Sequence, residues 1–476
     1  MKKNTFAIFL VFSIIFSSTS QEKVFEIHES SFNPIGKSKE SFSVPNQRKT
    51  DVMLLIKEKM RNMAYLLDIN YKIKSSIFSE KLPKNYSDLL GYNIQGNTYC
   101  IFFSNSKNTK YGVQIFDFEN KTSSIQLLDF KIKKESFVET INYNNKFHLI
   151  TISNNTSDLN IYTFNQNFEF QKNTISLKEL EYENSIDGSI VTAYDKLMQY
   201  DISKVESNVP NAIEVTSKKI KLYLQDDQLL LTFDHRSKET HIYHINLESF
   251  TSTYQAIAKP SKMEKGYKIS NSYIYYNKIF QIASSPKKMR FTIKKLETGK
   301  LIKEYVVKQK DSITFKNSPI IQDGFSFFTD SSNKVRKMEK TSKYLRKISL
   351  SDIGISAYKI NNKFNLRLGS FKEVQSGGAP MPGFQGMPIT SVGGFNLMFN
   401  GYHSYTSATS TYINCLFDDN FEHLEGKVEE NVYDKIKKFE NELKSKPKAI
   451  NIFTHKDRFY YGFYDKEKKN YEIYKF

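Results

Sequence analysis

Residues 137–177 read FVETINYNNKFHLITISNNTSDLNIYTFNQNFEFQKNTISL. Four short apolar runs, at residues 137–143, 146–153, 159–164 and 173–177, are separated here by polar residues rich in Asn, Asp and Ser. Those polar residues favour tight turns, and short apolar runs bounded by turn residues are typical of β-strands. The stretch therefore predicts four consecutive strands joined by tight turns.

The same group of four runs recurs at residues 220–258 and 273–307. When the third strand of every group is aligned, neighbouring apolar anchors lie about 46 to 51 residues apart, with larger gaps at insertions. A period of about 40–50 residues with four strands in each repeat is typical of propeller blades. The anchors of the aligned third strands are Leu66, Ile115, Ile161, Ile242, Ile293, Ile413 and Ile473.

Two further features fit stacked blades. Many strands are apolar on both faces, as in residues 99–103 (YCIFF). Strands of a sheet with one solvent-exposed face would instead alternate between apolar and polar residues. The last group has only three strands (450–454, 459–464 and 471–476), and residues 23–27 near the N-terminus offer a spare one. Donation of that strand would close a ring and remove an exposed sheet edge. In architecture the chain resembles the β-propeller superfamily, although no motif of an individual family is present.

The predicted fold class is therefore all-β, a β-propeller of seven four-stranded blades. An eighth blade is the alternative, because residues 312–349 could form a degenerate repeat. We expect residues 21–476 to form a single domain with two additions. Residues 376–394 (SGGAPMPGFQGMPITSVGG) are rich in Gly and Pro and predict an irregular loop insertion. Residues 428–444 have apolar positions at helical spacing and predict an amphipathic helix that packs on the propeller.

Residues 1–20 have the three parts of a secretory signal peptide. Lys2 and Lys3 are followed by an apolar run over residues 6–16 and then by small residues up to Ser20. The run is shorter than the roughly 20 residues that span a bilayer. We expect cleavage before Gln21, an exported (periplasmic or extracellular) protein, and no transmembrane segment.

The formal charge of +18 does not by itself indicate nucleic acid as a partner. Arg occurs at only eight positions and Lys supplies the remaining cations, spread without blocks of like charge. Sites that bind phosphate with bidentate geometry favour the planar guanidinium of Arg. Cys100 and Cys415 lie within strand patterns, where buried free thiols are expected; one disulfide stays open as the alternative.

No complete catalytic or cofactor motif was found. His241 and His244 are separated by an odd number of positions, so on a strand they face opposite sides and cannot converge on one metal ion. Asp226-Asp227 and Asp418-Asp419 fall between strands, where Asp is an ordinary turn residue. We therefore assign no catalytic residue, no metal site and no cofactor.

Binding residues concentrate on loops held by a rigid scaffold, so the loop at 376–394 is the predicted edge of a functional surface. A tolerated insertion is the alternative for this loop. The candidate binding residues in and beside it are Met381, Phe384, Met387, Tyr402 and Tyr405.

The function that this pattern favours is an exported binding or scaffold propeller, monomeric, with an unknown protein or glycan partner. Two alternatives remain open. One is a carbohydrate-active enzyme whose carboxylates converge at the central channel from several blades. The other is a binder of anionic surface glycans through lysines.

Overall fold

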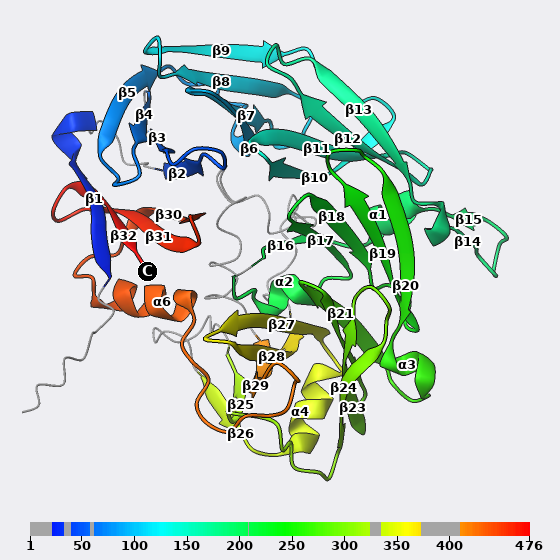
Figure 1. Cartoon of the computed structure of the whole chain (residues 1–476). Helices are drawn as coiled ribbons and strands as arrows, with labels where there is room; N and C mark the ends of the chain where they lie inside the picture. The colour runs from blue at the N-terminus through cyan, green and yellow to red at the C-terminus, as the bar shows by residue number, and fades with distance from the viewer. Residues whose placement is uncertain (1–20, 33–39, 58–60, 208, 324–334, 373–409) are drawn as a thin grey trace, which may run out of the picture.

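The computed structural model describes residues 21–476 except 33–39, 58–60, 208, 324–334 and 373–409. Seven sheets stand around a common axis, each with one edge strand near the centre and the other edge strand at the periphery (Figure 1). This arrangement confirms the β-propeller, and the seven sheets match the predicted number of blades.

The blades are numbered along the chain, and their strands are given from the centre outward. Blade 1 has β2 (Glu40–Pro45), β3 (Val52–Lys57), β4 (Asn62–Leu67) and β5 (Ile73–Ser79). Blade 2 has β6 (Asp88–Gln95), β7 (Thr98–Ser104), β8 (Tyr111–Asp117) and β9 (Thr122–Leu128). Blade 3 has β10 (Glu135–Tyr143), β11 (Lys146–Ser153), β12 (Asp158–Phe164) and β13 (Phe170–Ser176).

Blade 4 has β17 (Ile220–Gln225), β18 (Gln228–Phe233), β19 (Glu239–Asn246) and β20 (Ser252–Ala258). Blade 5 has β21 (Ile269–Tyr275), β22 (Lys278–Ser284), β23 (Lys288–Lys295) and β24 (Leu301–Lys308). Blade 6 has β27 (Asp352–Ile360), β28 (Lys363–Phe371), β29 (Ser410–Phe417), β25 (Ile320–Gln322) and β26 (Arg336–Met338). Blade 7 has β30 (Lys448–His455), β31 (Arg458–Asp465), β32 (Asn470–Lys475) and β1 (Glu22–His28).

The predicted period is confirmed strand by strand. Each of the seven anchors lies in the third strand of its blade, in β4, β8, β12, β19, β23, β29 and β32. The two-faced apolar pattern also has the predicted cause. Every residue of β4 is buried, whereas the outer strand β13 is largely exposed. Inner strands are covered by the neighbouring blades on both sides, so both of their faces must be apolar.

The ring closes with the N-terminal strand, as predicted. β1 pairs antiparallel with β32, and Phe25 lies opposite Ile473 while Ile27 lies opposite Tyr471. Phe25 and Ile27 are buried in a core that blade 7 shares with Val52 and Leu54 of blade 1. The first and last strands of the chain therefore complete one sheet and seal the joint between blades 7 and 1.

Residues 312–349 do not form an eighth blade within the described part of the chain. β25 pairs with the outer side of β29, and β26 pairs with β25, so both strands extend blade 6. α4 (Thr341–Ile348) follows and buries Tyr344, Leu345 and Ile348 in the core of blades 5 and 6. The charged residues Lys343 and Arg346 lie on the exposed side of α4.

The predicted C-terminal helix is α6 (Val432–Glu442), a few residues shorter than the expected 428–444. Ile436 and Phe439 bury its apolar face against Tyr461 and Phe463 of blade 7. Asn431 caps its N-terminus by accepting hydrogen bonds from the backbone N–H groups of the first turn.

A segment between blades 3 and 4 forms further elements that the sequence did not predict. β16 (Ile202–Val205) runs parallel to β17 on the channel side of blade 4, and α2 (Ile213–Ser217) packs against β27 of blade 6. The smaller elements are η1 (Glu29–Phe32), η2 (Lys178–Leu180), β14 (Tyr182–Glu183), β15 (Ile190–Val191), α1 (Ala193–Gln199) and α3 (Pro260–Met263).

Both cysteines are free thiols, Cys100 in β7 and Cys415 in β29. Burial raises the pKa of the Cys100 thiol to about 12, which keeps it protonated and unreactive. Among the described residues, no helix is both long and apolar enough to cross a membrane.

Removal of the closing strand should destabilise the whole ring. Phe25→Ala removes a buried aromatic ring from the joint, so we expect the free energy of unfolding to fall by about 3 kcal/mol. Deletion of residues 21–27 should cost more, because β32 then loses its partner. Glu22→Ala is the matched control, since it removes only an exposed ion pair with Lys475. Unchanged thermal melting after the deletion would contradict closure by β1.

Candidate functional site

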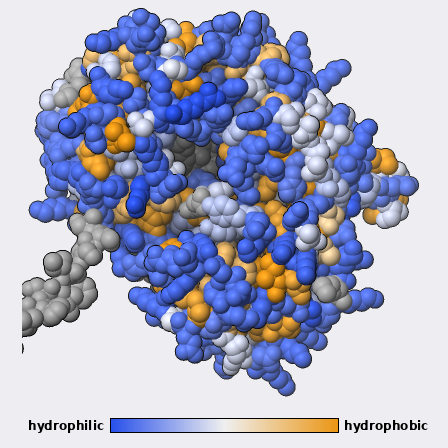
Figure 2. All heavy atoms as spheres, in the orientation of Figure 1, coloured by the Kyte–Doolittle hydropathy of each residue, from blue (hydrophilic) through white to orange (hydrophobic). Residues whose placement is uncertain are grey.

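A cavity of about 720 Å³ lies at one mouth of the central channel. Seen down the ring, the surface is hollowed at its centre and the rim of the hollow is mostly hydrophilic (Figure 2). The cavity is lined by the inner strands of blades 1, 2, 3 and 7, by Leu224 of blade 4, by β16 and the residues after it, and by Tyr433 of α6. Its apolar lining residues are Phe42, Leu89, Leu90, Tyr92, Ile141, Val205, Val209, Leu224, Tyr433, Ile452, Phe453 and Phe459.

The loop between β2 and β3 differs from its counterparts in the other blades. Six blades join their first two strands with two residues, such as Asn144–Asn145 and Lys456–Asp457, where positive φ angles match a tight hairpin. In blade 1 the corresponding connection is residues 46–51 (NQRKTD), here called the channel loop. The channel loop lines the cavity with five of its six residues, Asn46 to Thr50.

Blade 3 holds the channel loop in place. The side-chain amide of Asn145 donates to Asn46 Oδ1 at 2.8 Å, and Asn46 Oδ1 also accepts from the backbone N–H groups of Arg48 and Lys49. Gln47 and Asn145 exchange two more hydrogen bonds, each 2.9 Å long. The loop therefore reaches from blade 1 to the tip of blade 3, past blade 2, and its backbone is fixed at both ends.

The channel loop places two cations at the rim. Arg48 Nε donates to Asn144 Oδ1 at 2.8 Å, and Lys49 Nζ donates to Asn97 Oδ1 at 3.2 Å. Both acceptors are neutral amides at the hairpin tips of blades 3 and 2, so these contacts orient the cations without neutralising them. Lys456, at the hairpin tip of blade 7, also lines the cavity. Within the described residues, none of these three side chains forms an ion pair with a carboxylate.

β16 and the residues after it supply the opposite wall. Lys204 lies 3.5 Å from Glu139 of blade 3, and Glu206 follows two positions later. Burial raises the pKa of the Glu206 carboxyl to about 7, and Lys204 offsets only part of that rise. Asn211 fixes this turn by donating to the backbone oxygens of Glu206 and Val209. Glu206 is the one carboxylate among the described lining residues.

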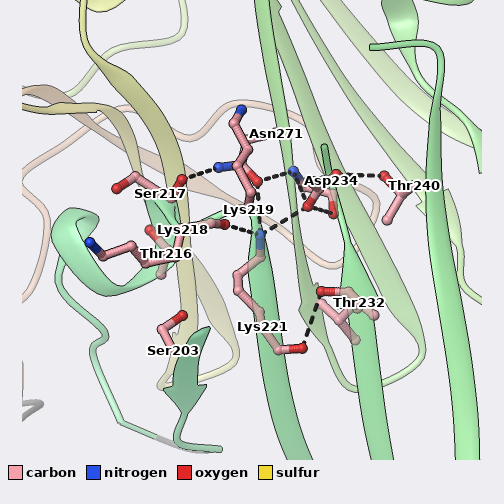
Figure 3. A network of polar contacts seen from close by, with 12 residues as sticks. Ser203, Thr216, Ser217, Lys218, Lys219, Lys221, Thr232, Asp234, Thr240 and Asn271 are labelled. Atoms are coloured by element: carbon pink, nitrogen blue, oxygen red, sulfur yellow. Dashed lines mark hydrogen bonds and ion pairs between the residues drawn. The ribbon is translucent and has the colours of Figure 1, made fainter. Parts of the chain in front are cut away.

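A second polar cluster lies inside the ring, between blades 4, 5 and 6 (Figure 3). Lys221 and Lys259 each pair with Asp234, at 2.9 and 2.8 Å, and the three side chains have no exposed surface. Burial alone would raise the pKa of Asp234, but the two ammonium groups hold it well below its usual range. This cluster is enclosed, so we assign it to the framework.

Hydrogen bonds join the cluster to three blades. Lys221 also donates to Asn271 Oδ1 of blade 5 at 2.8 Å. Asn271 in turn donates to the backbone oxygens of Ser217 in α2 and Ile353 in blade 6. The hydroxyl of Ser272 donates to Asp234 at 2.7 Å. Blades 4, 5 and 6 and the channel segment α2 are thus tied together by one charged centre.

The two histidines of β19 and the paired carboxylates lie in a strand and in turns, respectively. His241 and His244 contact different neighbours across β19, Tyr254 and Gln255 respectively. In the described part of the chain, no three His, Cys, Asp or Glu residues are grouped to hold a metal ion. Asp226-Asp227 forms the β17–β18 turn, and Asp418 accepts backbone hydrogen bonds in the turn after β29.

The predicted binding residues lie outside the described residues. Met381, Phe384, Met387, Tyr402 and Tyr405 all fall within 373–409, so the predicted role of that loop stays a prediction.

Sequence reasoning missed the channel loop. Its signal was available, because the connection between the first two strands of blade 1 is longer than the two-residue turns of the other groups.

No known family profile matches the chain, and no curated protein matches its sequence. Several solved structures are similar to it in fold. One is the Dos1 propeller, with 9% identity and a TM-score of 0.34 over 96% of this chain and 95% of that chain. Another is the Nup133 β-propeller domain of Vanderwaltozyma polyspora, with 11% identity and a TM-score of 0.31 over 93% and 99%. The Synechocystis apocarotenoid oxygenase has 9% identity and a TM-score of 0.29 over 56% and 61%.

Loss of the central charge of the buried cluster should destabilise the protein strongly. Asp234→Asn leaves Lys221 and Lys259 buried without a counter-charge, so we expect a loss of about 3–5 kcal/mol in chemical denaturation. Asp201→Asn is the matched control, because its partner Lys218 is at the surface and such a pair contributes at most about 1 kcal/mol. Equal effects of the two substitutions would show that the cluster does not tie the blades together.

Proposed function

We propose that the chain is an exported binding propeller that holds a small organic ligand in the cavity at the channel mouth. The observation that carries this proposal is the channel loop: one blade replaces a two-residue turn with six residues, and five of them line the cavity. The loop adds polar groups to the channel mouth, whereas a two-residue turn would complete the sheet equally well. Functional residues concentrate on such loops when a rigid scaffold holds them.

The size and lining of the cavity support a small ligand. Ligand pockets in proteins are commonly about 300–1,000 Å³, mostly apolar, with a few placed polar groups. The floor here consists of buried side chains such as Phe42 and Leu89, and the rim carries Arg48 and Lys49. Five blades contribute to the lining, so ligand contacts would depend on the closed ring.

A carbohydrate-active enzyme receives less support from this cavity. Glycoside hydrolysis ordinarily uses two carboxyl groups about 5–9.5 Å apart. Glu206 is the single carboxylate among the lining residues that the structure describes. The arrangement favours binding over hydrolysis, and a scaffold role for other surfaces of the propeller is compatible with it.

Export is part of the proposal. Residues 1–20 lie outside the described residues, and β1 begins at Glu22, immediately after the predicted cleavage site. Cleavage before Gln21 would therefore remove the signal peptide and leave the closing strand complete.

Mass spectrometry of the N-terminus of the protein from its native host tests export. We expect the mature chain to start at Gln21, since the apolar run and the small residues before it define the cleavage site. A mature protein that retains Met1 would contradict export by this signal.

The binding proposal predicts that a small molecule accompanies the protein from its native host. Protein isolated without prolonged dialysis should release one such molecule per chain on denaturation, as detected by mass spectrometry. Ser207→Trp places an indole in the cavity and should abolish retention, because Ser207 lines it at the rim. Ser249→Trp, in a turn of blade 4 away from the cavity, is the matched control. Retention by both variants, or by neither, would refute binding in this cavity.

A further inference from the structure

The rim of the cavity has more positive charge than its neighbours neutralise. Arg48, Lys49, Lys204 and Lys456 line it, and among the described residues only Lys204 has a carboxylate within ion-pair distance. The one lining carboxylate, Glu206, is half-buried and half-neutral near neutral pH because its pKa is raised to about 7. A concave site lined by one sign of charge concentrates ions of the opposite sign.

Arg48 is oriented for a specific contact. Its Nε donates to Asn144 Oδ1 of blade 3, and its two terminal nitrogens make no hydrogen bond to another described residue, so they are available to a ligand. The backbone on which it stands is fixed by Asn46 and Asn145. A guanidinium held in this way suits a planar or tetrahedral anion, because its N–H groups bind two oxygens at once.

The floor of the cavity has the opposite character. Its lining is mostly apolar: Phe42, Leu89 and Tyr92 are each less than a tenth exposed, and Leu224 and Phe459 are half-buried. A ligand that satisfies both parts has an apolar body and an anionic group at one end. A purely hydrophilic anion would leave the apolar floor in contact with water. A neutral apolar molecule would leave the cations at the rim without a counter-charge.

We infer that the ligand is a small amphiphilic anion (a carboxylate, sulfonate or phosphate on an apolar body) that Arg48 binds at the rim while the body lies on the floor. This inference rests on the proposed binding function and names the chemical class of the ligand. Arg48 carries the direct contact, while Lys49, Lys204 and Lys456 add long-range attraction.

A tryptophan reporter makes the site observable, because the chain contains no Trp. Thr454→Trp places an indole on the exposed side of β30, among the lining residues. The probes are 1-anilinonaphthalene-8-sulfonate and N-phenyl-1-naphthylamine, which share an apolar aromatic body and differ in the anionic group. Quenching of the introduced indole then reports occupancy of the cavity. Thr298→Trp, in the turn between β23 and β24, serves as the reporter outside it.

We expect the sulfonate to bind at least about tenfold more tightly than the neutral amine, and Arg48→Gln to weaken the sulfonate by about tenfold or more. Arg458→Gln is the matched control: it removes the same charge from an exposed arginine at the start of β31 that does not line the cavity. At about pH 8, where Glu206 is mostly ionised, Glu206→Gln should tighten sulfonate binding, because a repelling charge is lost. Melting curves establish that each variant is folded.

The outcomes separate this inference from the proposed function. If both probes quench the reporter with equal affinity and Arg48→Gln changes neither, the cavity binds apolar molecules and the anionic class is wrong. An equal loss of sulfonate affinity with Arg458→Gln would likewise show that the attraction arises only from the net charge of the protein. If neither probe quenches the reporter at Thr454 more than the reporter at Thr298, the cavity is not a binding site and the proposed function fails as well.

Discussion

The pairing of β1 with β32 is the constraint on which the rest of the structure depends. Seven blades stacked around an axis bury both faces of their inner strands only when each blade has a neighbour on both sides. An open ring would expose the faces of blades 1 and 7, including Val52 and Leu54 of β3. The first strand of the described chain therefore has to return to the last one, and Phe25 and Ile27 fill the joint between the two blades.

Closure also determines where a site can lie. The inner strands of all blades converge on the channel, and β16 and α2 occupy part of it on the side of blades 4 and 6. The remaining space opens between blades 1, 2, 3 and 7, where the channel loop contributes Arg48 and Lys49. The charged cluster around Asp234 stiffens the opposite half of the ring, since it joins blades 4, 5 and 6 away from the cavity.

Much of the fold could be predicted because it follows from local patterns. The third-strand anchors, the two-faced strands and the closing strand each depend on residues within a few positions of one another, such as Ile413 within β29. Chain insertions were harder to assign. β25 and β26 are three residues long and separated from β29 by most of blade 6, so no local period reveals them. β16 is parallel to β17 and needs a crossover, which the hairpin pattern does not predict.

The site was less predictable than the fold for a physical reason. Its residues come from blades 1, 2, 3, 4 and 7, and their proximity depends on the curvature of the ring rather than on spacing along the chain. Arg48 and Asn144 are 96 positions apart and meet only through the channel loop. The buried charges near Asp234 give no sequence signal either. Lys221 lies between two apolar residues of β17, which is where a solvent-facing lysine of a strand would also lie.

The most direct test of the account is a crystal of the protein soaked with 4-iodobenzoate, read through the anomalous scattering of iodine. We expect an iodine peak above the apolar floor near Phe42 and Leu89, with the carboxylate turned toward Arg48 at the rim. Iodine peaks only elsewhere on the molecule, or a carboxylate turned away from Arg48 in an occupied cavity, would contradict it.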